Sequence, residues 1–181
     1  MIFNTLQIPD LIVFEPNVIS DNRGYFIETF NKKIIESILG YNLNFCQDNE
    51  TKSSYGVLRG LHYQKKPHSQ TKLVRVVKGE ILDVVVDLRK DSPTFGMYNS
   101  IILNETNKKQ LLVPRGFAHG FLSLADDTRV LYKVDNYYNP KSERGIIFND
   151  KDLGIDWKLN PDQFKISEKD KTLPSLRDIE I

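Results

Sequence analysis

The stretch KLVRVVKGEILDVVVDL, residues 72–88, decides the fold class. Residues 72–79 and 81–88 are short runs rich in valine, isoleucine and leucine, and the segment VKGE between them has the composition of a tight turn. β-branched residues favour extended backbone, and runs of about four to eight such residues bounded by Gly, Asn, Asp or Pro are typical of strands. This stretch therefore predicts two strands joined by a turn.

The same pattern recurs along most of the chain. Turn-forming sequences such as SDNRG, KDSPTFG and NPKSERG separate one apolar run from the next. Further strand-like segments occupy residues 11–16, 24–30, 99–104, 110–114, 120–125, 128–135 and 145–149. Many short strands with frequent turns indicate an all-β sandwich or barrel.

One segment has helical spacing instead. In NKKIIESILG, residues 31–40, Asn31 is placed to cap the start of a helix and Gly40 to stop it. The apolar face of this helix consists of Ile34, Ile35, Ile38 and Leu39. We expect one early helix packed on the β core, with the weakly periodic residues from about 161 to 181 wrapping around the outside.

Size, charge and cysteine content exclude several classes of protein. A chain of 181 residues fits one domain, residues 1–181, that buries roughly 70% of its unfolded surface. The 25 basic and 24 acidic residues nearly cancel, so no net field attracts nucleic acid or an anionic membrane. Cys46 is the only cysteine, which excludes an internal disulfide and a cysteine-rich zinc site. With no signal-peptide layout and no apolar run near 20 residues, we expect a soluble, cytoplasmic protein.

Two polar residues occupy positions of apolar parity on predicted strands. Lys72 shares its strand face with Val74 and Val76, and Tyr132 shares its face with Val130 and Val134. Both side chains would then point into a barrel interior. A second interpretation also fits, in which Lys72 extends outward from a strand end and Tyr132 is a core aromatic residue.

His62 lies in VLRGLHYQ, residues 57–64, one of three histidines in the chain. A lone strand histidine is more often a structural hydrogen-bonding group than a catalyst. Arg59 and His62 are three residues apart, so a regular strand would send them to opposite faces. A bulge at Gly60 would place both in one cavity.

Two histidine motifs resemble those of the cupins. PRGFAHG, residues 114–120, has the Pro-x-Gly-x-x-His spacing of the second cupin motif, and Gly56 followed by His62 opens the first. The second histidine of the first motif is replaced by Gln64. A three-histidine metal site of His62, His68 and His119 is one alternative, but a neutral amide is a poor substitute for an imidazole or carboxylate ligand.

Several longer segments together resemble the dTDP-4-dehydrorhamnose 3,5-epimerase family, a group of non-metal cupin jelly rolls. The resemblance runs from about residue 8 to residue 170. Its segments are DNRGYFIETF, FCQDNETKSSYGVLRGLHYQ, KLVRVVKGEILDVVVDLRKDSPTFG, LLVPRGFAHGFLSL, YKVDNYYNPKSERGI, NDKDLGIDW and ISEKD. The resemblance implies an all-β cupin jelly roll with one or a few short peripheral helices.

The family's reaction inverts C3 and C5 of a nucleotide-linked 4-keto-6-deoxy sugar and requires neither a redox cofactor nor a metal. Each inverted carbon lies next to the C4 ketone, so the reaction needs a base, a group that stabilises the enolate oxygen, and an acid on the opposite face. By resemblance, His62 is the base and Asp170 holds its imidazole. Lys72 stabilises the oxyanion, and Tyr132 is the proton donor. A neutral imidazole, with an ordinary pKa near 6.5, suits this role at neutral pH.

The resemblance also implies substrate-binding residues. Arg23, Arg59 and Lys169 correspond to positions that meet the pyrophosphate, and Tyr138 to the ring that stacks on the nucleobase. Phe26 is a second candidate for stacking. The remaining binding positions are Glu28, Gln47, Asn49, His119 and Glu143. From its strand parity, Asp83 could instead pair with Lys72.

In the family an early strand crosses to a partner subunit. The resemblance therefore implies a homodimer in which residues from about 11 to 30 make the dimer contact and complete the partner's site. Three alternatives remain open from the sequence: an enzyme that epimerises one carbon or acts on another nucleotide-linked keto sugar, a metal-binding cupin, and a sugar-nucleotide binding module without turnover.

Overall fold

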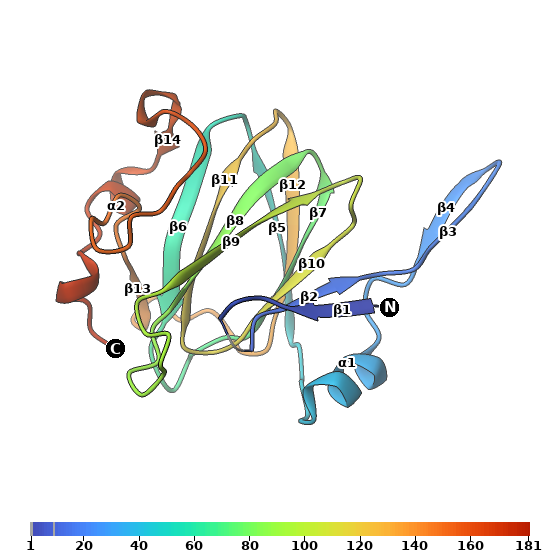
Figure 1. Ribbon diagram of the computed structural model, residues 1–181, viewed down its shortest axis with the longest axis horizontal. Coiled ribbons are helices and arrows are strands. Elements are labelled where there is room, and N and C mark those ends of the chain that lie inside the picture. The colour runs from blue at the N-terminus through green and yellow to red at the C-terminus, as the bar shows by residue number, and fades with distance from the viewer. Residues whose placement is uncertain (1, 9) are drawn as a thin grey trace.

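The computed structural model describes residues 2–8 and 10–181, and its core consists of two facing β-sheets (Figure 1). In spatial order, the first sheet contains β1 (Ile2–Thr5), β2 (Ile12–Glu15), β10 (Gln110–Val113), β7 (Lys72–Lys78), β12 (Thr128–Val134) and β5 (Gln47–Ser53). The second contains β13 (Glu143–Gly145), β6 (Val57–Gln64), β11 (Phe117–Ser123), β8 (Glu80–Asp87) and β9 (Tyr98–Asn104), with β14 (Lys165–Ile166) parallel to β6. Two antiparallel sheets whose neighbours are distant in sequence form a jelly roll, which confirms the predicted all-β fold class.

The stretch from Lys72 to Leu88 forms β7 and β8, one in each sheet. Both faces of β8 are buried. Ile81 and Val85 point into the core between the sheets, whereas Leu82 and Val84 pack on the outer side against the C-terminal part of the chain. A strand that is covered on both faces has a continuous apolar sequence rather than an alternating one, which explains the sequence of β8.

The C-terminal segment lies along the outer side of β6 (Figure 1). It contains the 3-10 turns Pro161–Gln163 and Leu176–Asp178 and the short helix α2 (Glu168–Lys171). Two backbone N–H groups fix it: Ile147 donates to Pro174 O at 2.9 Å, and Leu176 donates to the buried Asp150 carboxylate at 2.7 Å. These bonds hold α2 at the edge of the second sheet.

Helix α1 (Lys32–Leu39) forms where the sequence predicts it. Asn31 Oδ1 accepts a hydrogen bond from Ile34 N, and Gly40 ends the helix with a φ of +74°. Ile35 is buried against the outer face of the first sheet. Among the described helices, none has the length and apolar character needed to cross a membrane.

Strands β3 (Val18–Asp21) and β4 (Gly24–Ile27) form a separate hairpin that projects away from the barrel (Figure 1). Its apolar side chains are exposed: Ile19 is 59% exposed and Phe26 is 68% exposed. An isolated two-stranded hairpin is at best marginally stable in water, so this arm requires something to pack against.

Some predicted boundaries are wrong. The strand expected at residues 145–149 is instead β13, which ends at Gly145, because Ile147 N bonds to Pro174 O and the chain then turns. The strand expected at 24–30 ends at Ile27. Strands β1, β3 and β5 lie outside the segments predicted as strands.

Candidate active site

A cavity of about 440 Å³ opens between the two sheets. Strands of both sheets form its walls, and α2 with the chain before it closes one side. Its polar lining residues are Thr51, Arg59, His62, Lys72, His119, Tyr132, Lys165, Ser167, Lys169 and Asp170. The structure thus brings all four residues predicted as catalytic into one cavity.

His62 and Asp170 form a hydrogen-bonded pair, with 2.7 Å between Nε2 and Oδ1. Asp170 is 4% exposed, and its second oxygen accepts a hydrogen bond from Gly60 N at 3.2 Å. Burial alone would raise the pKa of Asp170, but the hydrogen bond and charge of His62, together with Gly60 N–H, lower it below its ordinary value. An ionised carboxylate on Nε2 orients the imidazole and leaves Nδ1 for proton transfer.

Helix α2 places this carboxylate. Ser167 caps the helix by accepting a hydrogen bond from Asp170 N at 3.1 Å. The preceding strand, β14, pairs with Val57 and Leu58 of β6, the strand that carries His62. The histidine and its carboxylate are therefore held by neighbouring elements although 108 residues separate them.

The predicted bulge at Gly60 is present. His119 pairs with His62 and Phe121 pairs with Arg59, so β6 advances three residues while β11 advances two. Gly60 has a φ of +114°, and a Cβ there would lie 2.6 Å from Gly120 Cα. The extra residue allows Arg59 and His62 to line the same cavity.

Lys72 lies in the cavity at the start of β7, on the same face as the buried Val74 and Val76. Its ammonium is therefore not directed outward into bulk solvent. Burial lowers the pKa of Lys72 to about 8, and the negative charges of Asp83 and Glu143 act in the opposite direction. A cation that has lost much of its hydration is well suited to stabilise a new negative charge in the cavity.

Tyr132 approaches from the other wall, because β12 belongs to the first sheet and β6 to the second. Its neighbours on the same strand face, Val130 and Val134, are buried as predicted. Burial raises the pKa of Tyr132, Arg59 lowers it and Glu143 raises it further. The phenol is therefore protonated at neutral pH and able to donate.

His119 and Asp83 form a second imidazole–carboxylate pair. His119 Nε2 lies 3.0 Å from each Asp83 oxygen, and Asp83 has no exposed surface. The hydrogen-bond partner of Asp83 is thus His119, while the charge of Asp83 also raises the pKa of Lys72. Asp83 therefore acts on two cavity residues, His119 through a hydrogen bond and Lys72 through its charge.

Tyr138, Glu143 and Lys169 form a network beside the cavity. Tyr138 OH donates to Glu143 Oε2 at 2.8 Å, and Lys169 Nζ pairs with the same oxygen. Burial would raise the pKa of Glu143, but these hydrogen bonds and the charges of Lys169 and His62 lower it. Lys169 lines the cavity, whereas Tyr138 is 54% exposed at its margin.

Of the candidate binding residues on β5 and β6, Arg59 lines the cavity, whereas Gln47 and Asn49 do not. Arg59 Nε donates to Ser53 Oγ at 3.2 Å. Gln47 Nε2 donates to Asn49 Oδ1 at 2.8 Å, and Asn49 is paired in register with Tyr132. Thr51 lies on the same face of β5 and lines the cavity, a residue that the sequence analysis did not identify. Its two-residue spacing from Asn49 is the signal that could have found it.

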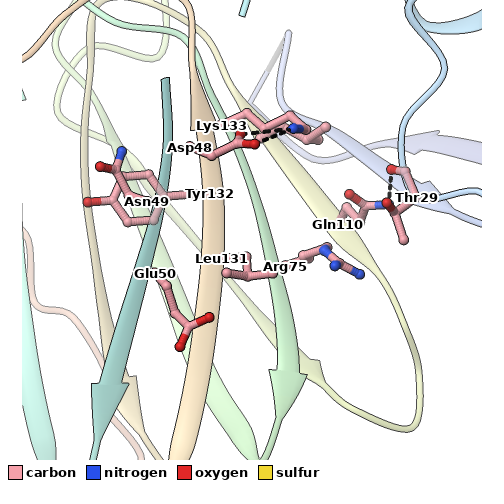
Figure 2. Close-up of a pocket in the computed structure, with 10 residues that line it drawn as sticks. Thr29, Asp48, Asn49, Glu50, Arg75, Gln110, Leu131, Tyr132 and Lys133 are labelled. Carbon is pink, nitrogen blue, oxygen red and sulfur yellow. Dashed lines mark hydrogen bonds and ion pairs between the residues drawn. The ribbon is translucent and has the colours of Figure 1, made fainter. Parts of the chain in front are cut away.

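The outer face of the first sheet carries a different and smaller cavity of about 270 Å³. In Figure 2, Arg75, Gln110 and Thr29 lie across β12 from Asn49 and Tyr132. Strand alternation directs Leu131 away from the catalytic cavity, whereas Tyr132 borders both cavities and Asn49 borders the outer one. This second cavity lacks His62, Lys72 and Asp170.

Arg23, Phe26 and Glu28 do not reach the catalytic cavity of their own chain. Arg23 lies at the hairpin tip and pairs with Asp21 at 2.5 Å. Phe26 is exposed on the projecting arm, and Glu28 accepts a hydrogen bond from Asn31 Nδ2 at 3.2 Å.

The three histidines do not form a common site. His68 lies outside the cavity and hydrogen-bonds to Ser142 Oγ and Asn139 Nδ2. His62 and His119 are each bonded to a carboxylate on Nε2. Within residues 2–8 and 10–181, no three His, Cys, Asp or Glu side chains are grouped to hold a metal ion. This geometry does not favour the metal-site alternative.

Comparison with known proteins gives one consistent result. Residues 5–178 match a family model described as dTDP-4-dehydrorhamnose 3,5-epimerase. The enzyme of that name from Shigella flexneri is 50% identical over 165 residues, which cover 91% of this chain and 90% of the relative. The crystal structure of the Elizabethkingia anophelis enzyme is 48% identical with a TM-score of 0.95 and covers 98% of this chain and 97% of that one. The Legionella pneumophila dTDP-6-deoxy-D-glucose-3,5-epimerase, solved in complex with dTDP-4-keto-L-rhamnose, is 44% identical with a TM-score of 0.94, covering 98% and 94% respectively.

Proposed function

The chain belongs to the dTDP-4-dehydrorhamnose 3,5-epimerase family, and from this premise we propose how its cavity performs the reaction. The protein is an isomerase that inverts C3 and C5 of dTDP-4-keto-6-deoxy-D-glucose to give dTDP-4-keto-L-rhamnose. One observation carries the assignment of roles: a carboxylate-bound imidazole and a protonated phenol come from opposite sheets to one cavity that also contains a buried ammonium.

In the proposed mechanism, His62 removes the proton from the carbon next to the C4 ketone. The electron pair moves onto O4, and Lys72 stabilises the resulting enolate oxygen. Tyr132 then donates its phenol proton to the same carbon from the opposite face, which inverts the centre. Solvent takes the proton from His62 and returns one to Tyr132, so that the same two groups can act again on the second carbon.

Asp170 holds His62 in this scheme and stabilises the imidazolium that forms. The pair of His119 and Asp83 lies on the cavity wall near Lys72, where His119 is placed to contact the sugar. These roles rest on the hydrogen bonds and on the cavity that the residues share.

The nucleotide is proposed to occupy the margin of the cavity. Arg59 and Lys169 contact the pyrophosphate, for which Lys169 exchanges its ion pair with Glu143. Gln47 and Asn49 supply further polar contacts from β5. Tyr138, exposed at the margin, stacks on the nucleobase.

A homodimer with exchanged hairpins would complete the site. The β3–β4 arm exposes apolar side chains and projects away from its own barrel, so it fits a second copy of the chain better than solvent. Arg23, Phe26 and Glu28 would then contribute to the partner's site rather than their own.

Product analysis tests the proposal directly. The protein is incubated with dTDP-4-keto-6-deoxy-D-glucose, and the product is identified by NMR from the configuration at C3 and C5. We expect inversion at both carbons, and no inversion with the His62→Ala variant. Inversion at only one carbon would instead establish the single-carbon epimerase, and bound but unaltered substrate would establish a binding module.

A further inference from the structure

Gln64 ends β6 at the position where the metal-binding cupin motif has a histidine, and here its side chain joins two loops. Its Nε2 donates to His68 O at 2.6 Å and to Tyr137 O at 3.2 Å. Its Oε1 accepts a hydrogen bond from Asn139 N at 2.6 Å. The residue is 9% exposed, so this buried amide uses both donors and its acceptor on backbone groups.

A neutral imidazole could not make the same set of bonds, because it offers one donor and one acceptor. The amide offers two donors and an acceptor, and it carries no charge to desolvate. Besides removing a metal ligand, a glutamine at position 64 therefore makes hydrogen bonds to the two loops that a histidine could not make.

Further hydrogen bonds join the same two loops, residues 65–71 and 135–142. Lys65 N donates to Ser142 O at 2.9 Å, and Gln70 Nε2 donates to Asn136 O at 2.7 Å. His68 is bonded to Ser142 Oγ at 2.8 Å. These bonds hold both ends of the 135–142 loop, and Gln64 holds its middle.

Tyr138 lies between the two backbone groups that Gln64 binds in this loop, Tyr137 O and Asn139 N. Its ring is 54% exposed, so its orientation depends on the backbone rather than on packing around the ring. The phenol reaches Glu143 at 2.8 Å, and Glu143 pairs with Lys169 of the catalytic cavity. One buried amide thus fixes the backbone on both sides of an exposed aromatic ring beside the site.

We propose that Gln64 is a positioning residue for nucleotide binding, which presets Tyr138 as a platform for the nucleobase. The inference rests on the proposed function, in which Tyr138 stacks on the base. A platform that is already ordered loses less conformational freedom when ligand binds, so the ordering appears as affinity. Gln64 does not touch the sugar in this arrangement, so its contribution falls on binding rather than on proton transfer.

The test is a double-mutant cycle with dTDP as the probe, read by calorimetric titration of the full chain. Gln64→Met keeps the length of the side chain and removes its amide. We expect the Kd for dTDP to rise about 10-fold and KM for the sugar nucleotide to rise with it, while kcat changes less than about 3-fold. In a Tyr138→Ala background, Gln64→Met should cause no further loss of affinity.

Gln7→Met, at an exposed glutamine, is the matched control and should bind dTDP normally.

The possible results distinguish the positioning role of Gln64 from the stacking role of Tyr138. If Tyr138→Ala leaves dTDP affinity unchanged, the proposed stacking role of Tyr138 is wrong, and the inference falls with it. If Tyr138→Ala weakens binding but Gln64→Met does not, or if the two losses add, the positioning role alone is overturned. Should Gln64→Met fail to fold, Gln70→Met, which removes the bond to Asn136 O, enters the same cycle with the same criteria.

Discussion

The burial of Lys72 lowers its pKa, and the negative charges of Asp83 and Glu143 oppose this effect. The pKa of Lys72 is lowered to about 8, so the ammonium is present at pH 7 and lost as the pH rises through about 8. Since the proposed role of this cation is to stabilise the enolate, we expect kcat/KM to fall on the alkaline side with a midpoint near 8. The pKa of Tyr132 is raised above its ordinary 10.0, so ionisation of this phenol does not explain a loss at that pH.

Substitution of Lys72 checks this assignment. Lys72→Arg keeps its charge to far higher pH and should move the alkaline loss upward, although its larger planar group lowers the rate itself. Lys72→Met should lower kcat by about 10²-fold or more. An unchanged alkaline limb in the arginine variant would show that another group titrates there.

In the proposed mechanism, His62 and Tyr132 act on the reacting carbon and bind little of the nucleotide. We therefore expect His62→Ala and Tyr132→Phe each to lower kcat by about 10²-fold or more. The affinity for dTDP, measured by titration, should remain close to that of the unaltered chain. Equal losses of affinity in both variants would assign them structural roles instead.

At the scale of residues, the sequence revealed which polar residues occupy apolar strand positions, but not which side chains they contact. Strand parity left two interpretations open for Lys72 and Tyr132, and the structure places both side chains at the cavity between the sheets. The pairing of His119 with Asp83 could not be predicted in the same way. It depends on the register between β11 and β8, where His119 lies beside Val85 and Phe121 beside Asp83.

At the scale of elements, Asp87 organises the loop that follows β8. It has no exposed surface and accepts hydrogen bonds from Arg89, Ser92 and Thr94. Burial raises the pKa of Asp87, but these bonds outweigh burial and lower the pKa to about 2. The folded pKa thus lies below the ordinary 3.8, so the folded state binds fewer protons, and this stabilisation is present above pH 4 and lost as the pH falls towards 2.

Asp87→Asn should therefore lower the free energy of unfolding at pH 7 by about 3 kcal/mol, because it removes the buried charge that pairs with Arg89. The difference from the unaltered chain should shrink as the pH falls below 4. Urea unfolding at pH 7, 4 and 3 measures both effects. Asp91→Asn, at an exposed position of the same loop, should change little; a constant difference at all three pH values would contradict the account.

Elements were predictable where one face is apolar. Residues 32–39 and the strand around Val74 have that pattern and were found, and the strand around Val85 was found from its continuous apolar run. β5, with the sequence QDNETKS, was missed because its inward face carries polar residues, among them Asn49 and Thr51, in place of aliphatic ones. Without alternating apolar residues, a strand lacks the periodic signal by which it is recognised in a sequence.

At the scale of the whole molecule, the order of strands could not be derived from local patterns. β2 and β10 are adjacent although about 100 residues lie between them, and β12 separates β7 from β5. The resemblance to a family implied a jelly roll, but not which strands are adjacent. The exchanged dimer stays a prediction, and its physical argument is the exposed arm.

Mixing two inactive variants tests whether sites are shared between copies. His62→Ala damages the body of a site, and Arg23→Glu damages the arm that it would lend to its partner. Alone, each should have little activity. Co-expressed at equal levels, half of the dimers are mixed and each contains one intact site, so about a quarter of full activity should return. No recovery, in a sample shown by light scattering to contain dimers, would contradict the exchange.

The proposed mechanism requires His62 and Tyr132 on opposite faces of one sugar ring. Deuterium exchange in D₂O, followed by NMR of the unreacted dTDP-4-keto-6-deoxy-D-glucose, measures this directly. In Tyr132→Phe, His62 can still remove a proton and return a deuteron from its own side, so we predict exchange into substrate that outpaces inversion, whereas His62→Ala should show neither. Inversion that persists in Tyr132→Phe at the rate of the unaltered chain, or exchange that persists in His62→Ala, would contradict it.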